Sequence, residues 1–253
     1  MTAILEVRDV TVRFGGLTAI DGVSFAVEAG ELLGLIGPNG AGKTTMLRSI
    51  TGVVRPGAGQ VLLDGADLGG RSIAQRIRAG LALSQQLVRP FRAFSLLDNV
   101  ALAAGHAKTR GPLGAFAAFG RSDERERARA LLALVGIAEA AEARPASLPL
   151  GVLKRLEVAR ALALEPRVLL LDEPLAGLNS REARALAETV KGLQGKGLSI
   201  VLIEHNLSEV MRVADRLVVL DNGRKIGEGA PRAVMADAAV RAAYLGAGAH
   251  AEA

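Results

Sequence analysis

The 253-residue sequence contains no cysteine and no tryptophan, and only 3% of its residues are aromatic. Without cysteine the chain forms no disulfide and binds no metal through thiolates, which suits a reducing compartment. So few aromatic side chains also argue against a platform on which the bases of single-stranded nucleic acid stack. We therefore expect neither a disulfide-stabilised domain nor a direct nucleic-acid partner.

Long hydrophobic runs are missing as well. No apolar stretch reaches the roughly 18 residues of a membrane-spanning helix, and residues 1–6 lack the charged and apolar regions of a signal peptide. We therefore expect a soluble, cytoplasmic chain. Half of the residues are hydrophobic, which is enough for the core of one large domain or two small ones. The net charge of +5 is mild and its basic residues are scattered, as on a solvated surface.

One glycine-rich segment fits the pattern G-x-x-x-x-G-K-[ST], which is typical of a loop that binds phosphate groups. The apolar run at residues 31–36 predicts a buried strand before it, and residues 46–50 predict the first turn of a helix after it. This context disfavours the alternative, a glycine-rich turn with a solvated lysine. The segment consists of Gly37, Pro38, Asn39, Gly40, Ala41, Gly42, Lys43, Thr44 and Thr45.

Each part of this loop has a use in binding ATP with Mg²⁺. Glycines let backbone N–H groups approach anionic oxygens closely, and the helix N-terminus adds partial positive charge. Lys43 can reach the β- and γ-phosphates, and the Thr44 hydroxyl can ligate Mg²⁺. We therefore expect ATP and Mg²⁺ as ligands.

Alternating apolar and polar residues at 5–14 predict a half-buried strand, and residues 23–27 and 61–65 predict two more. A small antiparallel sheet beside the nucleotide is the simplest arrangement of these strands. Phe14 would lie on this sheet as an apolar plate for adenine. The alternative is that Phe14 belongs to the core.

Helical spacing rich in Ala, Leu and Arg extends from residue 96 to about residue 160, so we expect a helical insertion in an α/β core. Glycine and proline within residues 108–121 predict a loop. Asp123 with Glu126 predicts a capping box that opens a helix ending at Gly136. We also expect a helix at 72–78, a strand at 80–84, a helix that Asn179 or Ser180 caps and that runs to about residue 193, a hairpin at 216–226, a helix at 231–245 and a frayed tail at 246–253.

Two carboxylates end a continuous apolar run at residues 167–171, which is typical of a parallel strand buried on both faces. They would emerge at the carboxyl edge of the sheet, where ligands bind in such folds. Asp172 would hold Mg²⁺ directly or through a water, and Glu173 would orient and deprotonate the attacking water. The alternative is that Asp172 and Glu173 merely end a strand.

Polar residues follow two other predicted strands. Gln86, after the strand at 80–84, could reach Mg²⁺ and the water, although a Gln-Gln pair alone is a weak signal. His205, after the apolar run at 198–203, could bond the γ-phosphate or the Glu173 carboxylate, although a lone histidine is more often a surface or core residue. His106 and His250 have no such context and receive no role.

In this order the motifs resemble those of the nucleotide-binding subunit of ATP-binding-cassette (ABC) transporters, over essentially the whole chain. They are Phe14, GPNGAGKTT, Gln86, the helical insertion, VLLLDEP, AGLN and IEHN. The resemblance implies the roles given above and a head-to-tail dimer with a second ABC ATPase subunit, with two ATP molecules between them. It implies that the groove around Gln86 receives short helices of an integral membrane permease. The loop at the dimer interface would be Ala176, Gly177, Leu178 and Asn179.

The resemblance also implies a single nucleotide-binding domain of the α/β class. Its P-loop NTPase core would be a mostly parallel sheet flanked by helices, with a small antiparallel β subdomain and an inserted α-helical subdomain. We assign residues 1–86 and 161–230 to the core with its β subdomain, 87–160 to the helical subdomain and 231–253 to a carboxyl-terminal helix and tail. The chain would lie at the cytoplasmic face of the cell membrane, held by permease subunits that an extracytoplasmic solute-binding protein serves.

Finer features resemble the branched-chain amino-acid uptake ATPases, namely RFGGLTAIDGVSF, AGLN, IEHNLSEVM and AAYLG. We therefore expect an ATPase that powers uptake of a small solute, first of all branched-chain amino acids. The alternatives are an ABC ATPase of lipopolysaccharide export or urea uptake, an ATPase acting on nucleic acid or ribosomes, and an ATP-binding regulatory subunit. The single cassette opposes the nucleic-acid alternative, and the intact Glu173 and His205 oppose the regulatory one.

One motif departs from the family. The usual signature is Leu-Ser-Gly-Gly-Gln, or Leu-Ser-Tyr-Gly-Gln in this branch, whereas this chain has Leu148, Pro149, Leu150, Gly151 and Val152. The family's serine donates its hydroxyl and its backbone N–H toward the γ-phosphate bound by the other subunit, and Pro149 has neither donor. Gly151 keeps a close backbone approach and the helix dipole. We hypothesise that this signature supports weak closure, which in a heterodimer would impair one of the two ATP sites.

Overall fold

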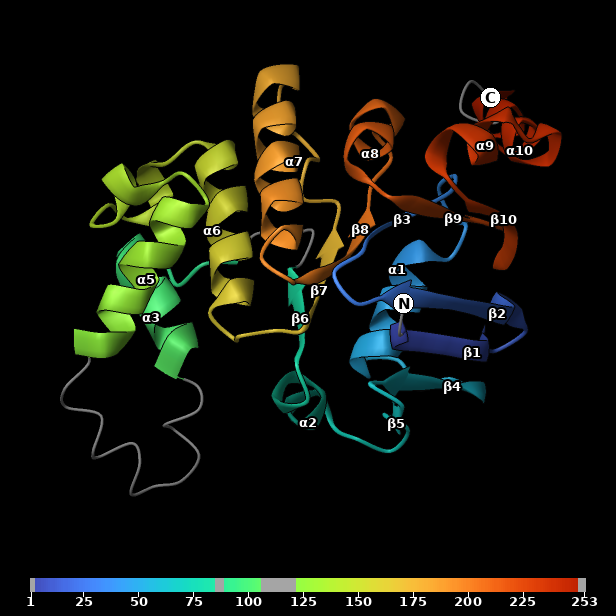
Figure 1. The fold of residues 1–253 in the computed structure, drawn as a ribbon, viewed down its shortest axis with the longest axis horizontal. Coiled ribbons are helices and arrows are strands. Elements are labelled where there is room, and N and C mark those ends of the chain that lie inside the picture. Colours follow the sequence, from blue (N-terminus) through green and yellow to red (C-terminus); the bar gives the residue numbers. More distant parts are fainter. Residues whose placement is uncertain (1–2, 85–88, 106–121, 250–253) are drawn as a thin grey trace.

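A computed structural model of the chain describes residues 3–84, 89–105 and 122–249. It contains a four-stranded antiparallel sheet in the order β2-β1-β4-β5 (Figure 1). The predicted antiparallel sheet is therefore confirmed. Its second strand begins earlier than expected because residues 17–22 pair with the end of the first strand across the turn at Gly15 and Gly16. The strands are β1 (Ala3–Phe14), β2 (Leu17–Glu28), β4 (Ala58–Leu63) and β5 (Ala66–Asp67).

A second sheet of six strands has the order β10-β9-β3-β8-β7-β6. All neighbours in it are parallel except β10, which pairs with β9 as the predicted antiparallel hairpin. The carboxyl ends of β3, β8, β7 and β6 therefore meet at one edge. The strands are β3 (Leu32–Ile36), β6 (Leu81–Ser84), β7 (Val168–Asp172), β8 (Ser199–Ile203), β9 (Arg216–Asp221) and β10 (Arg224–Gly229).

The central strands are buried on both faces, as their apolar runs predict. In β7, Leu169 and Leu171 pack into a core formed with helices, whereas Val168 and Leu170 pack into a core shared with the antiparallel sheet. The helix after the phosphate loop, α1 (Lys43–Thr51), contributes Met46 to this second core. The two cores explain why strand residues of both orientations are apolar.

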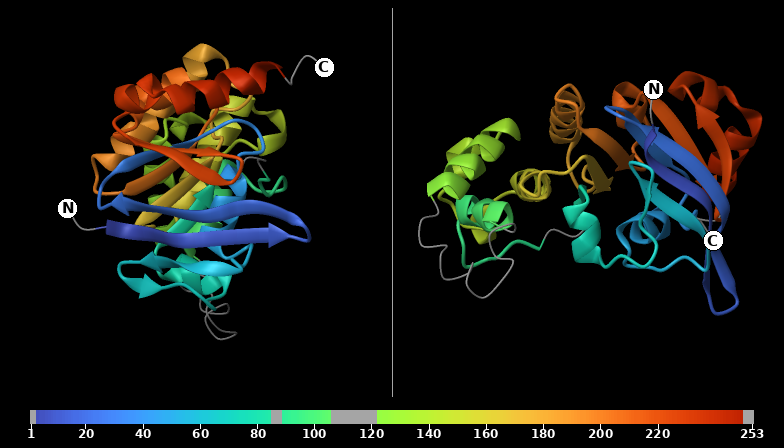
Figure 2. Two further views of the ribbon diagram at one scale, coloured as in Figure 1. Left: turned by 90° about the vertical axis from the view of Figure 1, so that its right-hand side faces the viewer. Right: turned by 60° about the horizontal axis from the view of Figure 1, so that its bottom comes forward.

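The first core is covered by helices from the second half of the chain, namely α7 (Ser180–Gln194), α8 (Leu207–Val213), α9 (Pro231–Ala236) and α10 (Ala238–Ala249). A group of helices lies at the end of the molecule farthest from the antiparallel sheet (Figure 2). It consists of α3 (Leu96–Ala104), α5 (Ser122–Leu134) and α6 (Leu150–Leu162), with short 3₁₀ turns at Ala138–Ala140 and Pro145–Ser147. A further helix, α2 (Ile73–Arg78), begins after Ser72.

Three details of the helix predictions are wrong. The helix α5 already includes Ser122, so Asp123 lies in its first turn and is not the cap of a capping box. The predicted helix at 231–245 is divided at Asp237, because the Asp237 carboxylate accepts the N–H of Ala239 at 2.7 Å and starts a new helix. This helix continues to residue 249, where we expected a frayed tail; alanine, frequent there, has the highest helix propensity. The predicted loop at 108–121 lies outside the described residues.

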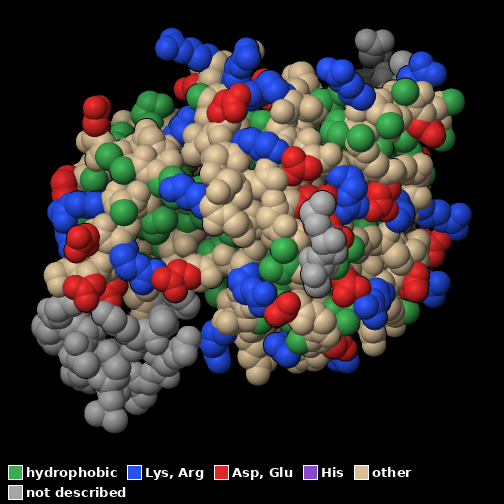
Figure 3. All heavy atoms as spheres, viewed as in Figure 1, with side chains coloured by type: hydrophobic (Ala, Val, Ile, Leu, Met, Phe, Trp, Pro, Cys, Tyr) green, Lys and Arg blue, Asp and Glu red, His purple; other side chains and the backbone are tan. Residues whose placement is uncertain are grey.

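Other local predictions are confirmed. Asn179 accepts the N–H of Glu182, and the Glu182 carboxylate accepts the N–H of Asn179, so this capping box opens α7. Within the described part of the chain, no helix combines the length and apolarity needed to cross a bilayer. On the face shown in Figure 3, basic and acidic side chains are interspersed, as expected of a solvated surface.

Candidate nucleotide-binding site

The phosphate loop connects β3 to α1, and its backbone is packed too tightly for side chains at two positions. Gly37 has a φ of 150°, and a Cβ there would lie 2.1 Å from the carbonyl oxygen of Leu220. Gly42 has a φ of 99°, and its Cβ would lie 2.7 Å from the carbonyl oxygen of Ala19. Neighbouring backbone therefore requires glycine at both ends of the loop.

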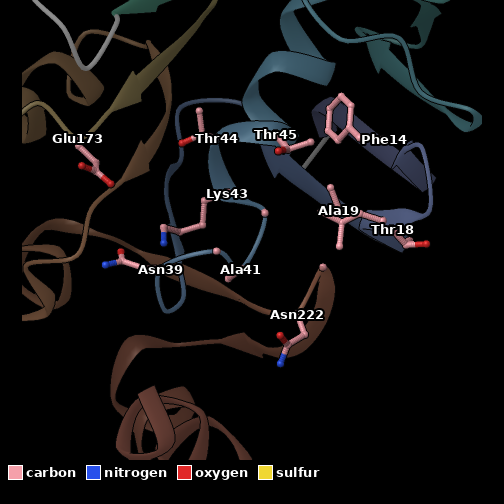
Figure 4. Close-up of a pocket in the computed structure, with 14 residues that line it drawn as sticks. Phe14, Thr18, Ala19, Asn39, Ala41, Lys43, Thr44, Thr45, Glu173 and Asn222 are labelled. Atoms are coloured by element: carbon pink, nitrogen blue, oxygen red, sulfur yellow. The ribbon is translucent and has the colours of Figure 1, made fainter. Parts of the chain in front are cut away.

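A cavity of about 550 Å³ opens beside this loop, which is within the usual size of small-ligand sites. Figure 4 shows Phe14 and Glu173 on opposite sides of it, with the loop residues between them. The predicted residues Gly37 and Pro38 do not line the cavity. It is lined by Phe14, Leu17, Thr18, Ala19, Asn39, Gly40, Ala41, Gly42, Lys43, Thr44, Thr45, Glu173, Asn222 and Gly223.

Lys43 is buried and held by the loop itself. Its Nζ donates hydrogen bonds to the carbonyl oxygens of Gly37, at 2.7 Å, and Pro38, at 2.9 Å. Burial lowers the pKa of Lys43, while the carboxylates of Glu173 and Asp172 raise it. The loop thus fixes an ammonium group at the wall of the cavity, with two carboxylates near it.

Two of the three predicted Mg²⁺ ligands, Thr44 and Asp172, lie together although 128 positions separate them. Thr44 Oγ1 donates to Asp172 Oδ1 over 3.4 Å. Burial raises the pKa of Asp172, and Glu173 raises it further, whereas the hydrogen bond from Thr44 lowers it. A hydroxyl and a carboxylate beside a phosphate loop fit Mg²⁺, which is commonly bound through one or two carboxylates and substrate phosphates.

Glu173 and His205 also come together, because β7 and β8 are neighbours and both end at this edge. The distance from His205 Nδ1 to Glu173 Oε2 is 3.9 Å. The N–H of Glu173 donates to the carbonyl oxygen of Ile203 at 3.0 Å, which ties the residue after one strand to the end of the next. Gln86 lies outside the described residues, as do His106 and His250.

Phe14 has 51% of its surface exposed and lines the cavity, so the alternative of a core phenylalanine is wrong. The turn between β9 and β10 was missed as part of the site. Gly223 accepts the N–H of Asp21 at 2.9 Å and donates its own N–H to Ala41 at 3.2 Å, so this turn joins β2 to the phosphate loop. The sequence shows the turn at Asn222 but not which segment it touches.

The segment resembling the signature and the predicted dimer loop lie side by side. Pro149 precedes α6, where no described side chain caps the helix, and Leu150 is 43% exposed. Gly177 has a φ of 79°, and a Cβ there would lie 2.9 Å from the Leu150 side chain. Leu148, Val152 and Leu178 pack against the first core, and Ala176 donates its N–H to Glu173 at 3.2 Å.

Comparison with known proteins agrees with this geometry. A family model described as "ABC transporter" matches residues 20–176, which is more than half of the chain. The chain belongs to the ABC transporter family. A second model, for the branched-chain amino acid ATP-binding cassette transporter, matches residues 224–250 of this ABC protein.

The ABC protein is 37% identical to the high-affinity branched-chain amino acid transport ATP-binding protein BraF of Pseudomonas aeruginosa, over 96% of the chain and 98% of the relative. It is 35% identical to LivG of Escherichia coli, a protein of the same description, with the same coverage. It is also 40% identical to the ribose import ATP-binding protein RbsA of Pseudomonas putida, but over 91% of the chain and only 44% of the relative.

Solved structures give the same fold. The ADP conformation of MJ1267, an ATP-binding cassette of an ABC transporter, superposes with a TM-score of 0.85 at 29% identity, over 97% of the chain and 100% of that structure. A dimeric post-hydrolysis state of the cassette MJ0796, bound to ADP and phosphate, superposes with a TM-score of 0.78 at 25% identity, over 90% of the chain and 99% of that structure. The predicted family and fold class are confirmed.

Proposed function

We propose that this ABC protein hydrolyses ATP to power the uptake of a small solute, and that the solute is a branched-chain amino acid. The hydrolytic part rests on one observation above all: Thr44, Asp172 and Glu173 meet at the phosphate loop from distant parts of the chain. The proposed identity of the solute rests on the similarity to BraF and LivG over nearly their whole lengths and on the carboxyl-terminal family match. RbsA is matched over less than half of its length, so ribose is the weaker candidate.

The loop amides and Lys43 would bind the β- and γ-phosphates, and Phe14 would stack on adenine. Mg²⁺, which neutralises phosphate charge when bound, would be held by Thr44 and Asp172 with Gln86. Glu173 would orient a water and take its proton as the water oxygen bonds to the γ-phosphorus and the bond to the leaving oxygen breaks. His205 would bond the γ-phosphate or hold the Glu173 carboxylate. ATP binding would close a dimer, and hydrolysis would reopen it.

One partner would be a second ABC ATPase subunit, with which this chain forms the dimer that closes. The others would be permease subunits and a solute-binding protein outside the membrane. We assign residues 87–160 to a helical subdomain, and a groove of about 330 Å³ between it and β6 would receive the permease. The Arg160 guanidinium lies 5.4 Å from the centre of the half-exposed Phe91 ring near this groove. The chain would thereby lie at the cytoplasmic face of the cell membrane.

The sequence from Leu148 to Val152 would affect how well the dimer closes over the partner's ATP site. If Pro149 takes the place of a donor to the partner's γ-phosphate, the site it covers loses a hydrogen bond to a charged group, which contributes about 1.5–3 kcal/mol. The uncapped start of α6 would still offer N–H groups and its dipole there. In a heterodimer, the site formed by Lys43 and Glu173 would then remain competent, while the site covered by Pro149 would be impaired.

ATP turnover by the complex copurified with its membrane subunits tests the proposal. Glu173→Gln should abolish turnover while MgATP still binds, because the amide cannot take the proton. Turnover that survives this change would contradict the role of Glu173, and a complex without turnover would indicate a regulatory subunit. The identity of the copurified permease separates amino-acid uptake from urea uptake and lipopolysaccharide export. Equal losses from Glu173→Gln and from the matching change in the partner subunit would reject the asymmetry.

A further inference from the structure

Glu173 has a backbone conformation that few residues other than glycine adopt. Its φ is 50°, in the left-handed region, where the Cβ makes the conformation unfavourable. Such a conformation persists only where the surrounding contacts impose it. The N–H of Glu173 is held by Ile203 and its carbonyl oxygen accepts the N–H of Ala176, but two buried charged side chains also act on this segment.

The first of them is Lys154, in the second turn of α6. It is 4% exposed, and its Nζ donates to the carbonyl oxygen of Glu173 at 3.1 Å. A buried ammonium group is costly unless carboxylates surround it. Burial lowers the pKa of Lys154, while the nearby carboxylates of Glu204, Glu173 and Asp172 raise it. Lys154 therefore places its charge among the acidic groups of the site and its hydrogen bond on the peptide that follows Glu173.

The second is Glu204, the residue between β8 and His205. It is fully buried, and its Oε1 accepts the N–H of Leu175 at 2.6 Å. Its Oε2 makes no hydrogen bond to any residue that the structure describes. Glu204 does not line the nucleotide cavity. Its hydrogen bond with Leu175 thus fixes the backbone two residues after Glu173. Glu204 follows this segment in the chain, whereas Lys154 precedes it.

We propose that Lys154 and Glu204 are positioning residues, which hold the backbone of residues 173–175 so that the Glu173 carboxylate faces the phosphate loop. The inference rests on the proposed role of Glu173 in hydrolysis. Lys154 acts through the Glu173 carbonyl and Glu204 through the Leu175 N–H. Neither residue is needed to bind nucleotide. Their loss lowers the rate of the chemical step and leaves the affinity for ATP as it is.

Two pairs of substitutions separate positioning from packing. Lys154→Met removes the donor, whereas Lys154→Arg keeps one. Glu204→Leu removes the acceptor for Leu175, whereas Glu204→Gln keeps Oε1. In the assembled complex, the Met and Leu variants should lower kcat by roughly ten- to a hundredfold, as expected for a lost hydrogen bond to a charged group. The Arg and Gln variants should recover most of this loss, and KM and the Kd for MgATP should change by less than about twofold.

Lys191→Met serves as the control, because it removes a lysine whose 2.6 Å ion pair with Asp215 lies on a partly exposed surface away from the cavity. Its kcat should equal that of the wild type. If Lys154→Met does not fold, the double variant Lys154→Met with Glu204→Gln removes both buried charges and should show the same loss of kcat.

A folded Lys154→Met or double variant with unchanged kcat would overturn the inference. So would a parallel loss of kcat and of MgATP affinity, or a Glu204→Gln variant as impaired as Glu204→Leu. The Glu173→Gln variant distinguishes a failure of the positioning role from a failure of the proposed function. If Glu173→Gln abolishes turnover and Lys154→Met does not lower kcat, only the positioning role fails. If turnover survives Glu173→Gln, the proposed function fails first.

Discussion

Glu204 should make the stability of the protein depend on pH in a way that one substitution removes. Burial raises the pKa of Glu204 from 4.5 to about 7; the nearby Glu173 raises it as well, while the N–H groups of Leu175 and His205 and the charge of Lys154 lower it. Because the folded state binds this proton more tightly than the unfolded state, the stabilisation is complete below pH 4.5. It is lost as the pH rises through the folded pKa near 7.

The difference between a pKa of 4.5 and one of about 7 corresponds to about 3 kcal/mol of unfolding free energy. Roughly 2–3 kcal/mol of this is lost between pH 5 and pH 8. Glu204→Gln keeps the acceptor for Leu175 but cannot ionise. Urea unfolding of the full chain, followed by circular dichroism, gives the free energy of unfolding of both proteins at the two pH values. The free energy of unfolding of the variant minus that of the wild type should rise by roughly 2–3 kcal/mol from pH 5 to pH 8. An equal difference at both pH values would refute the reasoning, since other titrating groups are common to both proteins.

Three substitutions test other parts of the structure. Gly42→Ala should cost about 1–3 kcal/mol of unfolding free energy and abolish nucleotide binding, because residue 42 has a left-handed backbone and its new Cβ would collide with Ala19. Gly16→Ala is the control and should retain binding, because nothing lies within 4 Å of a Cβ there. Normal ATP titration of Gly42→Ala would contradict this. Asn179→Ala should cost about 1 kcal/mol through loss of the capping box, and an unchanged urea midpoint would argue against it. Phe14→Ala should alter the unfolding free energy by less than about 0.5 kcal/mol, because the ring is half exposed. It should nevertheless weaken ATP binding several-fold, as measured by calorimetry. Unaltered affinity would exclude stacking on adenine.

The parts of the site that lie within one continuous segment could be predicted from the sequence. The phosphate loop is set by its own glycines and its flanking strand and helix. The placement of Asp172 follows from an apolar run buried on both faces, because the residue after such a strand emerges at the carboxyl edge of a parallel sheet. The capping box at Asn179 is likewise local, with both partners three residues apart.

Apart from the expected proximity of Glu173 and His205, features that depend on which strands are neighbours could not be predicted. Gly223 reaches the phosphate loop only because β9 pairs with β3, and no local pattern specifies this pairing. Glu204 and Glu173 each follow an apolar strand, yet one is fully buried against Leu175 and the other lines the cavity. The sequence pattern is the same for both, and the difference arises from the packing of the loop after β7 on the end of β8.

The central claim is that the phosphate loop holds a triphosphate while Asp172 and Glu173 approach it from the end of β7. A crystal structure of the Glu173→Gln chain with ATP and Mg²⁺ tests it most directly. We predict the phosphates on the amides of residues 39–45, adenine against Phe14, and Mg²⁺ between Thr44 and Asp172. An empty cavity at saturating nucleotide, or a metal bound away from Asp172, would contradict the claim.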